Sequence, residues 1–339
     1  MTEITIASWN IEHMHNWFDN TKSHVVDKLD PVATKVANII NKIKPQILCI
    51  QEGPTRLHQM ENFVDDYLDG DWQVIVGQNG SSQKPYIIYQ DFPGLQSVDK
   101  MVFDTTAWKY NFLEHQGKDN SYKKKRKSFS RLPVELIFNT SKGSFSVMSL
   151  HMKSKISFAD SDIHSSNATR QAKAVGEAIE QRARILQEAT LLRDYVQNHP
   201  FDDSIKGRMI VMGDLNDGPG KDYFETQFFS TDLLRRVRGD IDHVDEILDN
   251  GLERRKEDER FSAIFYDRID KELRSLLLDH VLISKRLIRR RGLRASPQSA
   301  KVRHKEYNEE NEANWNRKTK PDRLKYPSDH RPVSVKVRF

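Results

Sequence analysis

Cysteine is almost absent from this sequence, and its scarcity excludes several kinds of protein. The single residue, Cys49, cannot form a disulfide within the chain or build a cysteine-rich zinc site. It stands in the apolar run at 46–52, and free cysteine is among the most buried residue types, so we expect Cys49 to fill the core. A chain without disulfides suits a reducing compartment, which favours a cytoplasmic location.

Long apolar runs are also missing. No stretch approaches the roughly 18 apolar residues of a membrane-spanning helix, so we expect no membrane anchor. The opening, MTEITIASWN, begins with a strand pattern rather than a basic region and an apolar stretch, which predicts no secretory signal in the chain as given. Linkers and internal repeats are missing too, so we predict a single domain over 1–339 with polar insertions near 116–131, 154–168 and 295–327.

Charge is plentiful and unevenly placed. The chain has 54 basic and 49 acidic residues, a formal net charge of +5. Basic residues cluster at 123–127 (KKKRK) and 285–294 (KRLIRRRGLR), and more are scattered over 301–325. Such runs are often only solvated faces. Because lysine and arginine gain affinity by displacing counterions from phosphates, three clusters together favour a polyanionic partner.

Short strand patterns are interleaved with helical ones. Apolar runs predict strands at 3–11, 46–52, 72–78, 99–104, 133–139, 144–152, 208–214, 277–284 and 332–339. Helical spacing of apolar residues predicts helices at 30–43 and 167–199, and a short helix closed by glycine at 242–251. Mixed elements of this kind predict an α/β fold, a layered sandwich with mixed β-sheets.

Polar side chains follow many of these strands at the point where each strand ends. In IVMGDLNDGPG (210–220), an apolar strand gives way to Asp214 and Asn216, and Gly218 and Pro219 then turn the chain. The same change occurs at other ends, which carry Asn10, Glu52, His151, Lys153, Asp279, His280, Asp329 and His330. Each residue alone has a structural explanation, such as a turn or a satisfied core histidine. So many costly polar groups at apolar ends indicate a common use.

The residue types suit metal-assisted attack of water on a phosphodiester. Glu52, Asn10 and Asp329 offer the hard oxygen ligands that Mg²⁺ or Mn²⁺ prefers. Asp214 and His330 offer a base, and Asp279 can hold His330 in its useful tautomer. The donors for phosphate oxygens are His151, Asn216 and Lys153.

The order of these motifs (WN, QE, S-x-H, GD-x-N, DH, then SDH) resembles the endonuclease/exonuclease/phosphatase superfamily, which includes pancreatic-type deoxyribonucleases. The motifs run from Ser8 to Pro332 and so cover nearly the whole chain. The resemblance implies a four-layered sandwich of two mixed β-sheets flanked by helices, with the site where loop ends of the sheets meet. It also implies Mg²⁺ or Mn²⁺ as cofactor, with Glu52 as principal ligand and Asn10 and Asp329 near it.

The resemblance assigns further roles as well. It implies that Asp214 orients or deprotonates water and that Asn216 binds the scissile phosphate and helps to fix Asp214. His330, paired with Asp279, contacts phosphate or acts as acid or base, and His151 binds phosphate or protonates the leaving oxygen. Lys153 and Arg170 are inferred as additional phosphate contacts, and His280 as a supporting residue. The glutamate that orients the strand histidine in secreted deoxyribonucleases has no counterpart that the sequence reveals.

Three functions follow as hypotheses. The first is a divalent-metal-dependent nuclease, with DNA favoured over RNA because of the basic clusters. The second is a phosphatase or phosphodiesterase acting on a small-molecule or lipid phosphate. The third is a nucleic-acid-binding module without catalysis, against which the intact acidic and histidine motifs count.

Overall fold

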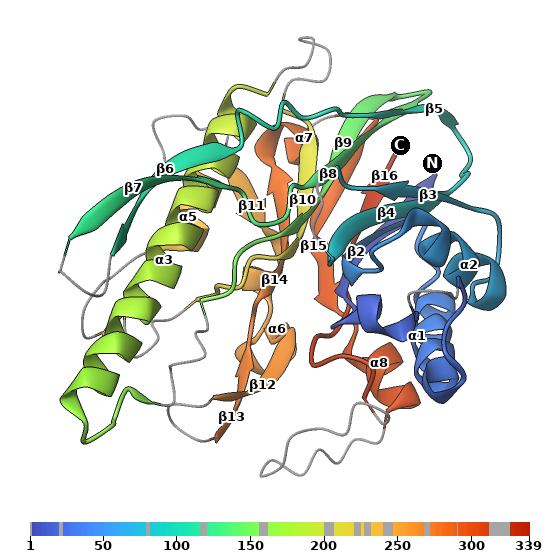
Figure 1. Ribbon diagram of the computed structural model, residues 1–339. Coiled ribbons are helices and arrows are strands. Elements are labelled where there is room, and N and C mark those ends of the chain that lie inside the picture. The colour runs from blue at the N-terminus through green and yellow to red at the C-terminus, as the bar shows by residue number, and fades with distance from the viewer. Residues whose placement is uncertain are drawn as a thin grey trace.

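Two β-sheets lie face to face between helices in the computed structural model (Figure 1). The structure describes residues 2–19, 23–78, 82–115, 121–155, 162–199, 207–219, 225–226, 232–239, 247–267, 272–289, 291–311 and 326–339. The first six-stranded sheet has the order β15 (Arg294–Val302), β16 (Val333–Arg338), β1 (Glu3–Asn10), β2 (Ile47–Gly53), β4 (Lys84–Gln90), β3 (Trp72–Val76). The second has the order β11 (Leu248–Asn250), β14 (Asp279–Ser284), β10 (Met209–Asp214), β9 (Gly143–His151), β8 (Val134–Thr140), β5 (Leu95–Lys100).

Both sheets are mixed, as the sequence predicts. In the first, β1 runs parallel to β2 and antiparallel to β16. In the second, β10 runs parallel to β9 and antiparallel to β14. The carboxyl ends of the parallel strands in each pair therefore lie at the same edge of the sheet.

Three apolar layers hold the sandwich together. Side chains from the facing surfaces of the sheets, including Cys49, form the central layer, and Cys49 is fully buried there as predicted. Helices α1 (Asp30–Ile43), α2 (Leu57–Tyr67) and α8 (His304–Glu310) pack against the outer face of the first sheet. Helices α3 (Ala168–Gln197) and α5 (Leu233–Arg238) cover the second sheet. The α/β sandwich of two mixed sheets flanked by helices is thus confirmed.

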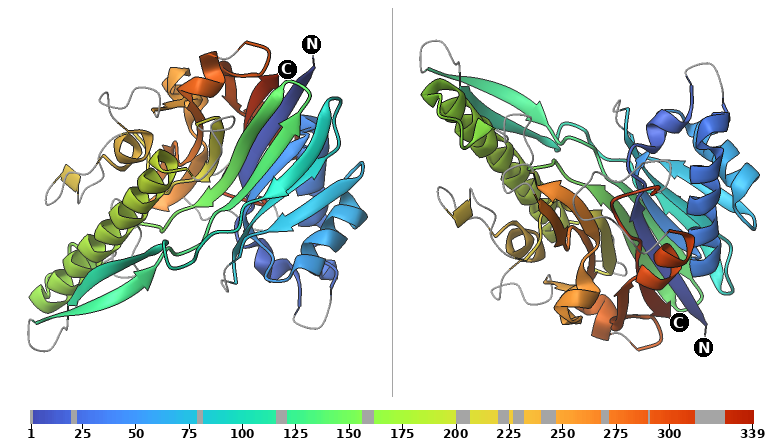
Figure 2. Two further views of the ribbon diagram at one scale, coloured as in Figure 1. Left: turned by 90° about the horizontal axis from the view of Figure 1, so that it is seen from above. Right: turned by 90° about the horizontal axis from the view of Figure 1, so that it is seen from below.

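A β-hairpin extends away from the sandwich beside the long helix α3 (Figure 2). Its strands are β6 (Lys109–His115) and β7 (Tyr122–Ser128), and β7 contains the basic run 123–127. We call this hairpin the basic arm. The remaining elements are a second hairpin and short helices near the sheet edges: β12 (Ala263–Asp267), β13 (Glu272–Leu276), α6 (Glu257–Arg260), α7 (Lys285–Arg289), and the 3-10 helices η1 (Met14–Trp17), η2 (Asp27–Leu29) and η5 (Gly251–Arg254).

The prediction of a short helix at 242–251 is wrong over its last residues. Residues 240–246 lie outside the described part of the chain, but Leu248 and Asn250 belong to strand β11 and pair with β14. Both side chains are buried there. Tertiary pairing therefore decides the conformation of a segment whose local pattern resembles a helix.

Gly213 provides a sharp test of how β10 fits between its neighbours. Its φ is 139°, and a Cβ atom would collide with the carbonyl oxygen of Leu150 on β9. We expect Gly213→Ala to lower the free energy of unfolding by at least about 3 kcal/mol, because backbone strain adds to the clash. Gly176→Ala is the matched control: the site in α3 has open space for a Cβ, so it should be neutral or stabilise by up to about 1 kcal/mol. Urea unfolding measures both, and similar values would contradict the prediction.

Candidate active site

The sheet registers bring the predicted residues together at one edge of the sandwich. Asp214, the last residue of β10, is directly opposite His151 on β9 and Asp279 on β14. In the other sheet, Asn10 at the end of β1 is opposite Gln51, which immediately precedes Glu52. Strand pairing alone thus places one carboxylate between a histidine and a second carboxylate.

A hydrogen bond joins the two sheets at this edge. The Asn10 Nδ2 donates to Asp214 Oδ2 at 3.0 Å, and both side chains are almost fully buried. Trp9, the preceding residue, donates from Nε1 to the carbonyl oxygen of His330 at 3.0 Å. The first strand of the chain therefore anchors both a residue of the other sheet and the segment just before β16.

Asp214 is the centre of the cluster. Besides the Asn10 amide, it accepts hydrogen bonds from the backbone N–H of Asn216 at 2.8 Å and from Asn216 Nδ2 at 3.1 Å. Asn216 has a left-handed backbone, φ 51°, and its Nδ2 also donates to Met152 O at 3.0 Å. Burial raises the pKa of Asp214 to about 7, although the His330 charge and these hydrogen bonds oppose the rise. The geometry gives Asn216 a positioning role, because its amide hydrogens are already directed to Asp214 and Met152.

His330 and Asp279 form a buried pair beside Asp214. His330 Nδ1 lies 2.6 Å from Asp279 Oδ2, and His330 Nε2 lies 3.9 Å from Asp214 Oδ2. Burial alone would lower the pKa of His330, but the two carboxylates raise it well above its usual value. Backbone N–H groups of Asp279 and His330 are held by Ser262 Oγ at 2.8 Å and Ser328 Oγ at 3.0 Å. The contact with Asp279 thus holds the ring with Nε2 toward Asp214, and the raised pKa favours the imidazolium form.

His151 lies on the opposite side of Asp214. Its Nε2 is 3.5 Å from Asp214 Oδ2 and 3.9 Å from Glu52 Oε1. Burial and the charge of Arg131 hold the pKa of His151 well below its usual value, so the ring is neutral at pH 7. Among the residues that the structure describes, no group hydrogen-bonds to its buried Nδ1. No orienting glutamate is therefore found here in the described part of the chain.

Glu52 completes the link between the two sheets. It lies within an irregularity in the pairing of β2 with β4, between Ile50 and Gly53, and has φ 58°. Its Oε2 accepts hydrogen bonds from the backbone N–H of His13 at 2.8 Å and from Gln83 Nε2 at 2.6 Å. Although burial would raise the pKa of Glu52, the hydrogen bonds from the side chain and the backbone of His13 lower it well below the usual range. Arg131 donates to the Gln83 Oε1 at 3.0 Å and so holds that amide in place.

The oxygen atoms of this cluster fit a divalent cation. Asn10 Oδ1 is buried and has no hydrogen-bond partner among the described residues, so it is available as a ligand. Glu52 supplies an ionised carboxylate, and Asp329 lies beside the cluster with Oδ1 3.6 Å from His330 Nε2. Carboxylate, amide oxygen and water are the ligands of Mg²⁺ and Mn²⁺. A different group, Asp214, Asp279 and His330, has one possible ligand atom from each residue within 4.8 Å of the other two.

The other residues named from the sequence lie at different places. Lys153 is the second residue after β9; its backbone N–H donates to Glu188 at 2.9 Å, and its Nζ donates to Ser154 O at 3.2 Å. Burial lowers the pKa of Lys153. Arg170 is exposed in the first turn of α3, and no described side-chain contact joins it to the cluster. His280 faces away from Asp279 and bonds to Asn250 and to Asp217 O, a supporting position.

Sequence reasoning missed several residues at this edge. His13 and His15 follow the WN motif within the run WNIEHMH, and this histidine pair is a signal that could have been used. Gln83 and Arg131 carry no local signal, because they reach Glu52 only through the fold.

No protein-family model matches the sequence, and no curated protein matches it either. Solved structures do match over the full length. An endonuclease/exonuclease/phosphatase family protein from Bacteroides thetaiotaomicron has a TM-score of 0.52 and 14% identity, covering 100% of this chain and 98% of that one. The chain has the endonuclease/exonuclease/phosphatase fold.

Two further structures share the endonuclease/exonuclease/phosphatase fold with this chain. A mannosyl-6-phosphatase from Bacteroides thetaiotaomicron matches with a TM-score of 0.52 and 14% identity, covering 99% of this chain and 100% of the other. TDP2 from D. rerio, solved in complex with a single-stranded DNA product, matches with a TM-score of 0.51 and 10% identity, covering 100% of both chains. The resemblance seen in the sequence is therefore confirmed as a shared fold. In the described part of the chain, no helix is both long and apolar enough to span a bilayer.

Proposed function

We propose that this protein is a divalent-metal-dependent phosphodiester hydrolase that cleaves DNA in the cytoplasm. The observation that carries the proposal is the setting of Asp214, a buried carboxylate held by Asn10 and Asn216 between neutral His151 and the charged His330–Asp279 pair. Asp214 thus has a neutral histidine on one side and a histidine–carboxylate pair on the other. Groups of different protonation state around one carboxylate are suited to acid–base catalysis at neutral pH.

Each side chain has a role in this proposal. Asp214 in its ionised form accepts a proton from the attacking water, and the Asn216 and Asn10 amides keep its oxygens in place. His330, as an imidazolium, donates to a phosphate oxygen, and Asp279 fixes its tautomer. His151 is neutral and donates to phosphate or to the leaving oxygen.

Glu52, Asn10 and Asp329 would hold a Mg²⁺ or Mn²⁺ ion, which supplies charge neutralisation at the phosphate. Lys153 lies two residues after His151 in the chain and adds positive charge near the phosphate. Arg170, which is exposed at the start of α3, stays a proposed contact for a more distant part of a long substrate.

The basic arm supports a nucleic-acid substrate. Lys125 and Lys127 are paired with Glu114 on one face of the hairpin. Lys124 and Arg126 lie on the other face and are exposed. Exposed lysine and arginine side chains along a strand can follow a phosphate backbone. The D. rerio structure with a DNA product shows that this fold accommodates DNA in another protein.

A plasmid assay tests the proposal. We expect purified protein to nick supercoiled DNA with Mg²⁺ or Mn²⁺ and to lose this activity in EDTA. Glu52→Gln, which removes the charge of the principal ligand, should require much more metal for the same rate. If plasmid, single-stranded DNA and RNA all stay intact with every metal, the nuclease proposal is wrong.

A small phosphate is the second candidate substrate, because a mannosyl-6-phosphatase shares the fold. Charge reversal on the basic arm separates the two candidates. We expect Lys124→Glu/Arg126→Glu to weaken DNA cleavage at least about tenfold at low salt, because two phosphate contacts are lost. Lys28→Glu/Lys44→Glu, on exposed lysines near α1, makes the same charge change and is the control. Equal rates on DNA for both variants, with release of inorganic phosphate from a sugar phosphate, would favour the phosphatase.

A further inference from the structure

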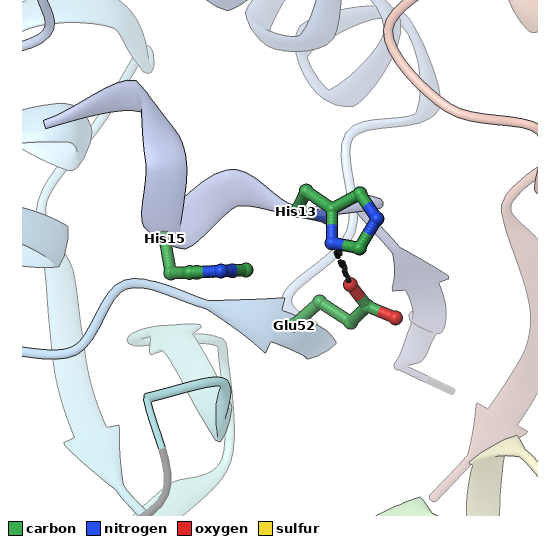
Figure 3. Close-up of side chains that lie close together, drawn as sticks. All are labelled: His13, His15 and Glu52. Carbon is green, nitrogen blue, oxygen red and sulfur yellow. Dashed lines mark hydrogen bonds and ion pairs between the residues drawn. The ribbon is translucent and has the colours of Figure 1, made fainter. Parts of the chain in front are cut away.

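Two histidines lie beside Glu52 (Figure 3). His13 precedes the 3-10 helix η1 and His15 lies within it, and their ring centroids are 5.6 Å apart. One possible ligand atom from each of His13, His15 and Glu52 lies within 4.8 Å of the other two. This spacing lets a single ion contact all three side chains.

The backbone holds this group in place. Met14 and Trp17 of η1 are buried in the apolar layer under α1 and α2 and so anchor the helix. His13 has φ 58° and ψ 29°, and its backbone N–H donates to Glu52 Oε2. Glu52 itself has φ 58°. Strained left-handed residues persist where the surrounding structure requires them, and they cluster at functional sites.

Glu52 faces two ways. Its Oε1 lies 3.9 Å from His151 Nε2, in the catalytic cluster, whereas its Oε2 lies 3.2 Å from His13 Nδ1. A carboxylate in this position can serve an ion on either side. Two-metal hydrolase sites share ligands in this way, with ions about 3.5–4 Å apart.

The ligand atoms of this group can be reached by an ion. His15 Nδ1 is buried and has no hydrogen-bond partner among the described residues. The His13 side chain is 54% exposed, which leaves a path from solvent. Gln83 Nε2 contacts both Glu52 Oε2, at 2.6 Å, and His13 Nδ1, at 3.1 Å. It is the group that a bound ion would displace.

We propose that His13, His15 and Glu52 form a second metal site, which takes a divalent transition ion such as Zn²⁺ or Co²⁺. Imidazole suits such ions, whereas the all-oxygen set of Glu52, Asn10 and Asp329 suits Mg²⁺ or Mn²⁺. Two histidines with one glutamate are an established ligand set for zinc with an open position. The inference deepens the proposed function, because Glu52 is common to both sites, and it makes the enzyme responsive to two kinds of ion.

Cobalt binding to the full-length, metal-free protein is the test. Co²⁺ is titrated by its visible absorption and by calorimetry, and Mg²⁺ by calorimetry alone. We expect His15→Ala to weaken Co²⁺ binding at least about tenfold, since even loss of an outer partner of a ligand costs about 10–100-fold. Mg²⁺ binding should change by less than about twofold, because its ligands are oxygens. His58→Ala, an exposed histidine on α2, should leave both titrations unchanged.

The outcomes separate this inference from the proposed activity. Equal Co²⁺ affinity in wild-type protein and in His15→Ala would overturn the second site, whatever the protein hydrolyses. Co²⁺ binding that depends on His15 would support the site even if no DNA were cleaved. Glu52→Gln should weaken both ions, and His15→Gln replaces His15→Ala if the smaller side chain disturbs η1.

Discussion

Asp214→Asn is expected to lower the rate of hydrolysis by about a hundred- to ten-thousandfold, the usual cost of losing a positioned base. The carboxylate is the only group in the described cluster that touches Asn10, Asn216 and His151 together. Asparagine keeps the size of the side chain but removes its charge and its capacity to take a proton. Single-turnover cleavage of a labelled DNA, with metal in excess, measures the effect on chemistry rather than on binding.

The control for this variant is Asp99→Asn, an exposed aspartate on β5. It should cleave at the wild-type rate. Because the new amide at position 214 would face the Nδ2 groups of Asn10 and Asn216, circular dichroism and thermal unfolding must accompany the assay. Asp214→Ser offers a second test with no opposed donors. Wild-type rates in both variants would show that Asp214 is not the base.

His330→Ala should both stop cleavage and destabilise the fold. The substitution leaves Asp279 as a buried charge without its partner, which costs about 3–5 kcal/mol in comparable cases. The pKa of His330 is raised in the folded state, so its stabilising contribution is fully present below the unfolded pKa of about 6.5. It is lost only as pH rises through the higher folded pKa. The loss on substitution should therefore be large at pH 6 and smaller at high pH.

A double variant separates the two effects. His330→Ala/Asp279→Ala removes the orphaned carboxylate, so we expect it to be more stable than His330→Ala alone while remaining inactive. Urea unfolding at pH 6 gives the difference, and the plasmid assay gives the activity. If the double variant were no more stable than the single one, the buried charge of Asp279 would not be the cause of the destabilisation.

Much of the sheet framework can be predicted from the sequence. The strands that carry the site, such as β1, β2, β9 and β10, are apolar runs with a polar residue at the end, and α1 matches its predicted bounds, 30–43. Several strands were missed, including β4, which lies inside the first sheet. β7 is a run of basic residues that is a strand only because it pairs with β6, and β15 contains Pro297, which is tolerated because β15 is an edge strand. The strand predicted at 99–104 lies earlier, at Leu95–Lys100, where pairing with β8 sets its register.

The residues of the site were easier to predict than the contacts between them. Strand ends indicated Asp214, His151 and Asn10, but no local pattern states that Asn10 crosses to the other sheet to bind Asp214, 204 residues away. The left-handed conformation of Glu52 is equally hidden, because glutamate has no intrinsic preference for it. Such features arise from long-range packing and need the three-dimensional structure.

The position of β1 has a consequence for the order in which the site can assemble as the chain is synthesised. This strand lies between β2 and β16, so one neighbour follows it soon in the chain and the other comes about 320 residues later. About 320 further residues must therefore be synthesised after Asn10 before His330 can pack beside the end of β1. In the proposed mechanism, a chain that stops before residue 330 has no acid–base histidine at this edge, so we expect such a chain to leave nucleic acid uncleaved.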